Sequence, residues 1–236
     1  MNTIIKINCL FLTLFFSLNA FSEEPYDPLE GMNRGIYSFN EWFDRNILEP
    51  VSIGYDYVTP DPVQTGVTNF FSNLKYPIYA VSDIFQGEIT QLGNDSTRFI
   101  LNTTVGLLGT IDVAKDVGFA EKKTDIGVTF GKWGISSGPY IVLPFIGPSN
   151  LRDTVGFVGE SFLTPQYYLG KTGMDAKTAE IATYSLLVLR IVQTRVNLAD
   201  AIKATREGSL DPYLFIQSSY YQLRAGQIGG KQEELE

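Results

Sequence analysis

The chain has 236 residues, of which 44% are hydrophobic and 19% are charged, so we expect one folded domain, or two small ones at most, and no long disordered region. It contains no histidine and a single cysteine, Cys9, which excludes a Ser-His-Asp triad, a Cys-His pair and a zinc site built on histidine. The net charge of −8 argues against a nucleic-acid partner, because such a partner needs a basic face.

The N-terminal segment, residues 1–22, is predicted to be a cleaved secretory signal. Lys6 is its only charged residue, and the apolar stretch that begins at Cys9 is about ten residues long, too short to cross a bilayer. Small residues at the third and first positions before the junction place cleavage after Ser22, with a retained membrane anchor as the alternative. Since Cys9 precedes the apolar stretch, it does not stand where a lipoprotein carries its lipid. The mature chain, from Glu23, is expected to lack cysteine and to have a net charge of −9.

Helix-start signals divide the first half of the mature chain. Asp27–Pro28 combines an N-cap residue with proline in the first turn, and Asp61–Pro62 repeats this pattern. Pro77 restarts a helix shortly afterwards. Apolar residues at helical spacing follow each signal. Four helices are predicted here, at residues 27–43, 61–74, 77–85 and 94–108.

The second half begins with a glycine-rich region. Residues 118–159 hold eight of the 22 glycines, so we expect an ordered loop or a poor hairpin packed by its own aromatic side chains. A short helix capped by Ser149 should follow, then a long helix from about Asp175 to Ala204, and a last helix opened by Asp211–Pro212.

Alternating strand patterns are scarce, so the predicted fold class is mainly α. The folded domain is expected to span residues 23–225. Residues 226–236 are acidic and rich in glycine and glutamine, and we expect them to form a disordered tail.

Two sequence patterns resemble catalytic motifs. The G-x-S-x-G pattern at Gly134–Gly138 lacks the histidine that its serine would need. The S-x-x-K pattern of Ser72 and Lys75, together with Lys171-Thr172-Gly173, needs no histidine. It leaves a periplasmic serine enzyme of penicillin-binding type as the alternative function.

No catalytic residue, metal site or cofactor is predicted from the acidic residues. Spacing typical of an EF-hand is absent. We expect the following side chains to be helix caps or surface charges: Asp83, Glu88, Asp112, Asp116, Glu121 and Asp125.

Several helices are apolar on more than one face, notably near residues 70–85 and 186–196. Such helices are either buried or in contact with lipid. No apolar run is long enough for a transmembrane helix. An ordinary core, helices lying in a membrane surface and a lipid-binding interior all stay open at this point.

A series of motifs, in order along the chain, resembles the MlaA (VacJ) family of outer-membrane lipid-asymmetry proteins. The series opens with Asp-Pro-Leu-Glu-Gly-Met-Asn-Arg at residues 27–34 and extends to Asp-Pro-Tyr at residues 211–213. The resemblance covers about residues 26–224. Its motif residues include Asp27, Pro28, Gly31, Asn33, Arg34, Arg98, Asn102, Asp112, Gly138, Pro139, Pro144, Arg152 and Asp153.

The resemblance implies a ring-like bundle of amphipathic helices, with one glycine-rich loop or short hairpin, embedded in the inner part of the outer membrane. It also implies a channel that passes misplaced phospholipids to a soluble periplasmic carrier, an association with a trimeric porin, and no bond made or broken. Many family members are lipoproteins, whereas this chain lacks the lipid-bearing cysteine. The motifs are densest at residues 130–145, so we expect Trp133, Tyr140, Val142 and Phe145 to contribute to the channel wall.

Overall fold

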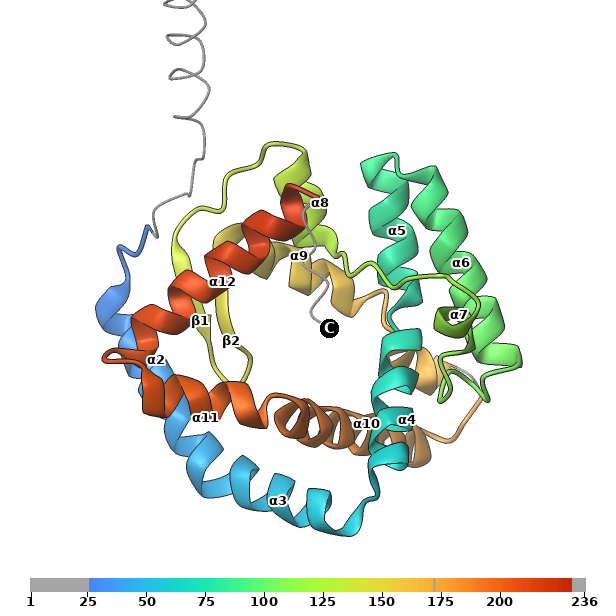
Figure 1. Cartoon of the computed structure of the whole chain (residues 1–236), viewed down its shortest axis with the longest axis horizontal. Helices are drawn as coiled ribbons and strands as arrows, with labels where there is room; N and C mark the ends of the chain where they lie inside the picture. Colours follow the sequence, from blue (N-terminus) through green and yellow to red (C-terminus); the bar gives the residue numbers. More distant parts are fainter. Residues whose placement is uncertain (1–25, 172, 231–236) are drawn as a thin grey trace, which may run out of the picture.

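The computed structural model describes residues 26–171 and 173–230, so the predicted signal peptide and the last six residues lie outside the described part. Figure 1 shows the helices arranged as a ring around a central opening, with the hairpin on one side and α4 and α5 on the other. The elements are α2 (Glu30–Phe43), η1 (Asp44–Leu48, a π-helix), α3 (Glu49–Val58), α4 (Asp61–Asn73), α5 (Tyr76–Gln86), α6 (Ile89–Thr104), α7 (Val113–Asp116), α8 (Ile126–Lys132), β1 (Tyr140–Leu143), β2 (Gly147–Asn150), α9 (Leu151–Ser161), η2 (Pro165–Lys171, a 3-10 helix), α10 (Ala176–Asn197), α11 (Ala199–Gly208) and α12 (Pro212–Ile228).

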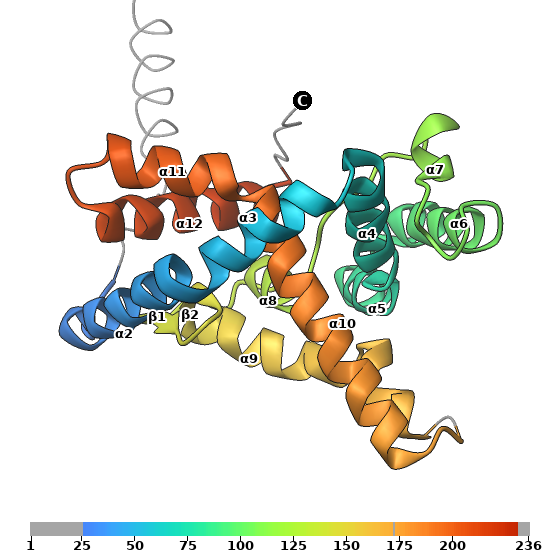
Figure 2. The same ribbon diagram turned by 90° about the horizontal axis from the view of Figure 1, so that it is seen from below.

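The predicted fold class, a mainly α ring with one short hairpin, is confirmed. The two strands are antiparallel, and Tyr140 pairs with Asn150. In Figure 2, α10 runs obliquely out of the plane of the ring, and its N-terminal end lies farthest from α11 and α12.

The first described helix begins two residues later than predicted. Asp27 does not cap it, because the helix starts at Glu30 with Leu29 in the cap position. The Asp27 carboxylate instead accepts hydrogen bonds from the Asn33 amide at 2.8 Å and the Gln217 amide at 3.0 Å. Asp27 therefore binds other side chains in the fold instead of the backbone nitrogens that the sequence predicts it to cap.

The sequence analysis missed the helix that continues from α2 through η1 into α3. Pro50 lies in the first turn of α3, where its nitrogen cannot donate the hydrogen bond of a regular helix. The turn directly before Pro50 is a π-helix, and its wider hydrogen-bond spacing accommodates the missing donor. The widened turn carries Asp44, which binds Arg195 of α10 and Arg206 of α11.

Helix α6 ends at Thr104, four residues before the predicted end at Leu108. Leu107 and Leu108 adopt positive φ angles of 52° and 60°, and the turn returns close to its own helix. A Cβ atom on Gly106 would lie 2.2 Å from the Ile111 carbonyl oxygen. The chain therefore leaves the helix through a turn that only glycine fits.

The glycine-rich region is more regular than predicted. Residues 118–159 contain α8, the hairpin and most of α9, and Phe130–Lys132, which the sequence analysis excluded from a helix, lies in α8. Gly127 and Gly156 let α8 and α9 approach closely, since a Cβ on Gly156 would lie 2.6 Å from the Gly127 nitrogen. The cap of α9 is Asn150 rather than the predicted Ser149.

The last helices follow their predicted starts but not all their predicted ends. Asp175 caps α10 and Asp211 caps α12, as the sequence predicts. The long predicted helix is divided at Leu198, where α10 ends and α11 begins in a new direction. Helix α12 extends to Ile228, so the predicted disordered tail is wrong for its first residues.

Candidate functional site

The hairpin is fixed to α2 by two asparagines, the buried Asn33 and the half-buried Asn40, which binds the Leu143 carbonyl and the Phe145 nitrogen. The Asn33 amide donates to the Tyr140 carbonyl at 2.9 Å and accepts from the Val142 nitrogen at 2.9 Å. Tyr140 and Val142 form the core cluster with Tyr213. Their exposed fractions are 1% and 3%. The sequence analysis placed both in the channel wall, but their burial leaves no surface that could contact a lipid.

The other two predicted wall residues are exposed. Trp133 lies just after α8 with 53% of its surface accessible, and its indole nitrogen donates to the Phe85 carbonyl at 3.0 Å. Phe145 lies in the turn between β1 and β2 with 61% accessible. Its ring packs edge-on against Phe39 and Phe43 on α2. Both side chains are held in place by neighbours while they keep an apolar surface free.

The exposed apolar surface extends well beyond these two residues. Monomeric soluble proteins rarely expose contiguous apolar patches of more than a few hundred Å², and here large apolar side chains are exposed on almost every long helix. Yet none of the helices in the described part is long and apolar enough to cross a membrane. Exposed examples from α5, α9 and α10 are Ile84, Phe85, Val155, Phe157, Val158, Ile181, Tyr184, Leu187 and Val188.

Polar motif residues connect segments that are distant in the chain. Arg34 on α2 forms an ion pair with Asp211 before α12, at 2.8 Å. Arg98 on α6 pairs with Asp112 at 2.8 Å, and Asn102 donates to the same carboxylate at 2.8 Å. Asp112 also caps α7, which is the role the sequence predicts for it. These contacts hold neighbouring segments of the ring together, and Arg98, Asn102 and Asp112 also line a cavity.

The most buried of these contacts joins α8, α9 and α12. The Asp153 carboxylate binds the Nε atoms of Arg152 and Arg224, each at 2.8 Å, and Arg224 also binds Asp125 through its Nη2 atom at 2.8 Å. Burial alone would raise the pKa of Asp153, but hydrogen bonds from Arg152 and the charge of Arg224 bring it below its ordinary value. Asp125 caps α8, as predicted.

The remaining motif residues shape the backbone around the hairpin. Gly138 adopts a φ of 68°, and the Pro139 carbonyl accepts from the Leu151 nitrogen at 3.1 Å. Pro144 lies in the turn between the strands. Pro28 lies in the turn before α2, and nothing within 4 Å of Gly31 explains why this position is glycine.

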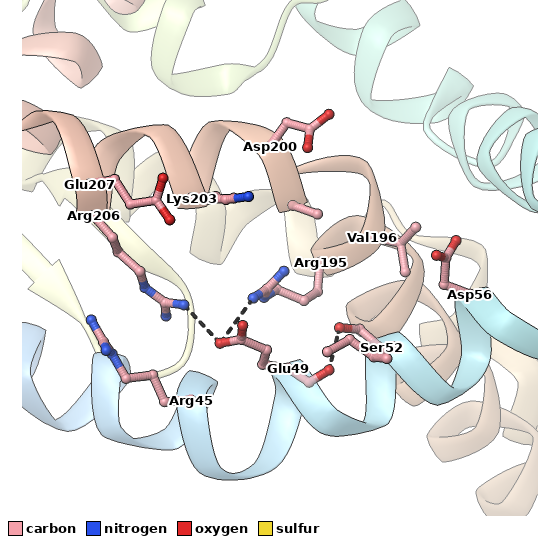
Figure 3. Close-up of a pocket in the computed structure, with 12 residues that line it drawn as sticks. Arg45, Glu49, Ser52, Asp56, Arg195, Val196, Asp200, Lys203, Arg206 and Glu207 are labelled. Atoms are coloured by element: carbon pink, nitrogen blue, oxygen red, sulfur yellow. Dashed lines mark hydrogen bonds and ion pairs between the residues drawn. The ribbon is translucent and has the colours of Figure 1, made fainter.

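A charged cavity of about 620 Å³ lies between α3 and the junction of α10 and α11 (Figure 3). Arg195 and Arg206 both point toward Glu49 there. Arg195 binds Asp44 at 2.7 Å, and Arg206 binds Glu49 at 2.8 Å and Asp44 at 2.7 Å. Since each arginine is paired with acids of the α2–α3 helix, the cluster closes the ring at this point.

A second cavity, of about 400 Å³, lies where α4, α5, α6 and α10 meet. It includes both residues of the alternative serine-enzyme hypothesis. The Ser72 hydroxyl donates to Glu121, and no hydrogen bond joins it to Lys75 within the described residues. Lys171 ends a 3-10 helix rather than lying on a strand. The geometry therefore gives the penicillin-binding type of enzyme no support.

The sequence prediction for Asp83 is wrong. Its side chain is fully buried on α5 beside Asp95 of α6, which is only 4% exposed. Burial and the neighbouring Asp95 raise the pKa of Asp83 to about 7. Glu88, by contrast, forms ion pairs with Lys122 and Lys132. No group of three potential metal ligands occurs in the described part of the chain.

Comparisons with known proteins agree with this architecture. The family described as MlaA lipoprotein matches residues 25–227. The "Intermembrane phospholipid transport system lipoprotein MlaA" of Escherichia coli strain K12 is 34% identical over 206 residues, which cover 83% of this chain and 76% of that protein. An uncharacterized protein of Rickettsia bellii is 33% identical and covers 87% of this chain and 78% of its own.

A solved structure is also similar over most of its length. It comes from a study of the structural basis for maintenance of bacterial outer membrane lipid asymmetry. The match has a TM-score of 0.72 at 31% identity and covers 86% of this chain and 98% of the solved one. The likeness therefore extends over most of the chain.

Proposed function

This chain belongs to the MlaA lipoprotein family, and on that premise we propose that it is a phospholipid channel of the outer membrane. It removes mislocalised phospholipids from the outer leaflet and passes them to a periplasmic lipid carrier, which maintains lipid asymmetry. The observation that carries the proposal is a ring of helices with large apolar side chains exposed on most of them, although no helix in the described part of the chain is both long and apolar enough to span a bilayer. Transfer of a lipid needs no covalent step, so the function does not require a nucleophile.

The exposed apolar side chains also account for membrane attachment. Relatives are named lipoproteins, whereas the position of Cys9 in this chain predicts a mature protein without an acyl chain. Burying one large apolar side chain contributes about 1.5–3 kcal/mol. A few of them together exceed the marginal hold of a single acyl chain. The chain is therefore held on the periplasmic side of the outer membrane by its own surface.

The channel wall includes the segment around α8 and the hairpin turn. Trp133 and Phe145 present apolar surface, and each is braced by aromatic neighbours from another helix, Phe85 of α5 and Phe39 of α2. A braced aromatic surface suits acyl chains, because these are recognised by apolar contact rather than by directed hydrogen bonds.

Two protein partners complete the proposal. A trimeric porin would surround or support the apolar outer surface of the ring within the membrane. A soluble lipid-binding carrier would receive phospholipid at the periplasmic face. Chemical cross-linking in intact cells, followed by identification of the attached proteins, tests both partners, and recovery of neither would contradict this part of the proposal.

The function is tested by the phospholipid content of the cell surface. In cells of the source organism that lack the chain, externally added phospholipase should reach more phospholipid than in cells that have it. Expression of the intact chain should return this access to its original level. Unchanged access after loss of the chain, with the outer membrane intact, would contradict the proposed function.

A further inference from the structure

The second cavity is lined by one more cation than acids. Its cations are Lys75 from the turn before α5, Arg98, Lys123 and Arg190 from α10, and its acids are Asp95, Asp112 and Glu121. Asp112 already neutralises Arg98. The carboxylate of Glu121 is engaged by the hydroxyls of Ser72 and Tyr79.

Lys75 and Arg190 have no ion-pair partner within the described residues. The structure contains no carboxylate within ion-pair distance of either side chain, although Lys75 is well enclosed by the cavity. Burial lowers the pKa of Lys75, and the nearby charges of Arg190 and Lys123 lower it further, against the opposing effect of Glu121. Arg190 is exposed on α10 whereas Lys75 is enclosed, so the cost of bringing the two cations together falls mainly on Lys75 unless an anion joins them.

The rest of the cavity fits an amphipathic anion. Its lining combines these cations with aromatic rings, including Phe71, Tyr76 and Phe99. Tyr76 and Phe99 stack with their ring centroids 4.4 Å apart, which gives a rigid apolar wall. The volume of about 400 Å³ lies within the usual range for small-ligand sites, about 300–1,000 Å³.

We propose that this cavity is a headgroup subsite in which Lys75 and Arg190 bind the phosphate of a phospholipid while the aromatic wall contacts its glycerol and first acyl carbons. This inference rests on the proposed function, because it assigns a place to the lipid that the channel carries. A phosphate between the two cations would relieve their mutual repulsion and form charge-assisted hydrogen bonds to both.

The test measures binding of three probes to the full chain in a non-ionic detergent, by titration calorimetry. The probes are dihexanoyl phosphatidylglycerol, dihexanoylglycerol without a phosphate, and inorganic phosphate. The variants are Lys75→Gln with Arg190→Gln, the charge-keeping pair Lys75→Arg with Arg190→Lys, and a matched loss of two exposed charges, Lys115→Gln with Lys203→Gln.

The proposal expects the wild-type chain to bind the phospholipid probe at least about tenfold more tightly than either other probe, since the phosphate and the apolar part both contribute. The double glutamine variant should lose about tenfold or more in affinity, while the charge-keeping pair and the matched control should stay within about threefold of wild type. Equal binding by the double glutamine variant, or equal binding of dihexanoylglycerol, would overturn the subsite. Equal binding of inorganic phosphate would overturn a lipid as the source of the phosphate.

The surface-phospholipid assay on the same chains separates this inference from the proposed function. If the wild-type chain restores lipid asymmetry but binding does not depend on the two cations, the subsite fails and the function stands. If binding depends on them and the wild-type chain restores nothing, the subsite stands and the proposed function fails.

Discussion

Replacing Asp83 with asparagine should stabilise the fold at neutral pH and flatten the dependence of its stability on pH. Asp83 is fully buried against Asp95, and neither of its carboxyl oxygens accepts a hydrogen bond within the described residues. The group is therefore satisfied only when it is protonated and donates to Asp95. Glu88 disfavours its ionisation further, and Lys122 favours it.

The sign and size follow from the pKa of Asp83 in each state. An aspartic acid in the unfolded chain has a pKa of about 4, whereas burial and Asp95 raise the pKa of Asp83 to about 7 in the fold. Between these values the folded state holds a proton that the unfolded state has lost. Stability therefore falls by about 1.4 kcal/mol per pH unit as the pH rises, and is level above about 7. From pH 5 to pH 8 the expected loss is about 3 kcal/mol.

Asparagine keeps the shape and the donor of the protonated acid but cannot ionise. The Asp83→Asn variant should gain about 2–4 kcal/mol over wild type at pH 8 and much less at pH 5. A smaller dependence on pH remains, because burial and the nearby Asp125 also raise the pKa of Glu160 to about 7.

The measurement is urea unfolding followed by circular dichroism at pH 5 and pH 8, with the full chain in a non-ionic detergent. Asp200→Asn, at an exposed position on α11, is the matched control and should change the free energy of unfolding by less than about 0.5 kcal/mol. Wild type that is equally stable at both pH values, or an Asp83→Asn variant less stable than wild type at pH 8, would refute the reasoning.

Three further perturbations test other parts of the structure. Arg224→Met leaves Asp153 buried beside an incomplete set of partners and should lower the free energy of unfolding by about 3–5 kcal/mol. Arg45→Met, at an exposed pair with Glu41, is the control and should lower it by less than about 1 kcal/mol. Equal effects of the two substitutions in urea unfolding would contradict the buried network. Asn33→Ala removes the two hydrogen bonds of Asn33 to the hairpin and should lower the free energy of unfolding by about 2–4 kcal/mol. Hydrogen exchange at the Val142 amide should become faster. Unchanged exchange at this amide would show that other contacts hold the hairpin. The double substitution Ser72→Ala with Ser136→Ala should leave phospholipase access to the cell surface at the wild-type level, and a rise to the level of cells without the chain, at normal protein abundance, would reveal an enzyme.

Local signals were enough to predict several helix starts. Asp175 and Asp211 each cap the helix that follows, and Asp211 keeps this role although it also forms an ion pair with Arg34 of α2. The same signal failed at Asp27, whose oxygens bind Gln217 from α12. A single sequence does not show which distant residue will compete for a capping side chain.

The prediction for the glycine-rich region, residues 118–159, was wrong for a related reason. Isolated glycines weaken a helix, so the sequence predicts a loop or hairpin there. In the fold, Gly127 and Gly156 let two helices touch backbone to backbone, and the packing gained offsets the lost propensity. This use of glycine depends on two segments that meet only in the folded chain.

The candidate site was predicted only in part. Apolar residues on several helix faces did not decide between a core, a membrane surface and a lipid-binding interior. A four-residue strand does not show which residues face the core, so the burial of Tyr140 and Val142 was missed. No sequence pattern placed Lys75 and Arg190 in one site, since only folding brings these distant positions to one cavity.

Contact between this chain and phospholipid is measured most directly by photo-crosslinking in living membranes. A photoreactive amino acid would replace Trp133 or Phe145, with Asp116, an exposed polar position on α7, as the control. The account predicts phospholipid attached at both aromatic positions and little at Asp116, as detected by mass spectrometry of the purified chain. Attachment of protein alone at Trp133 and Phe145, or equal amounts of lipid at all three positions, would contradict a lipid channel lined by these residues.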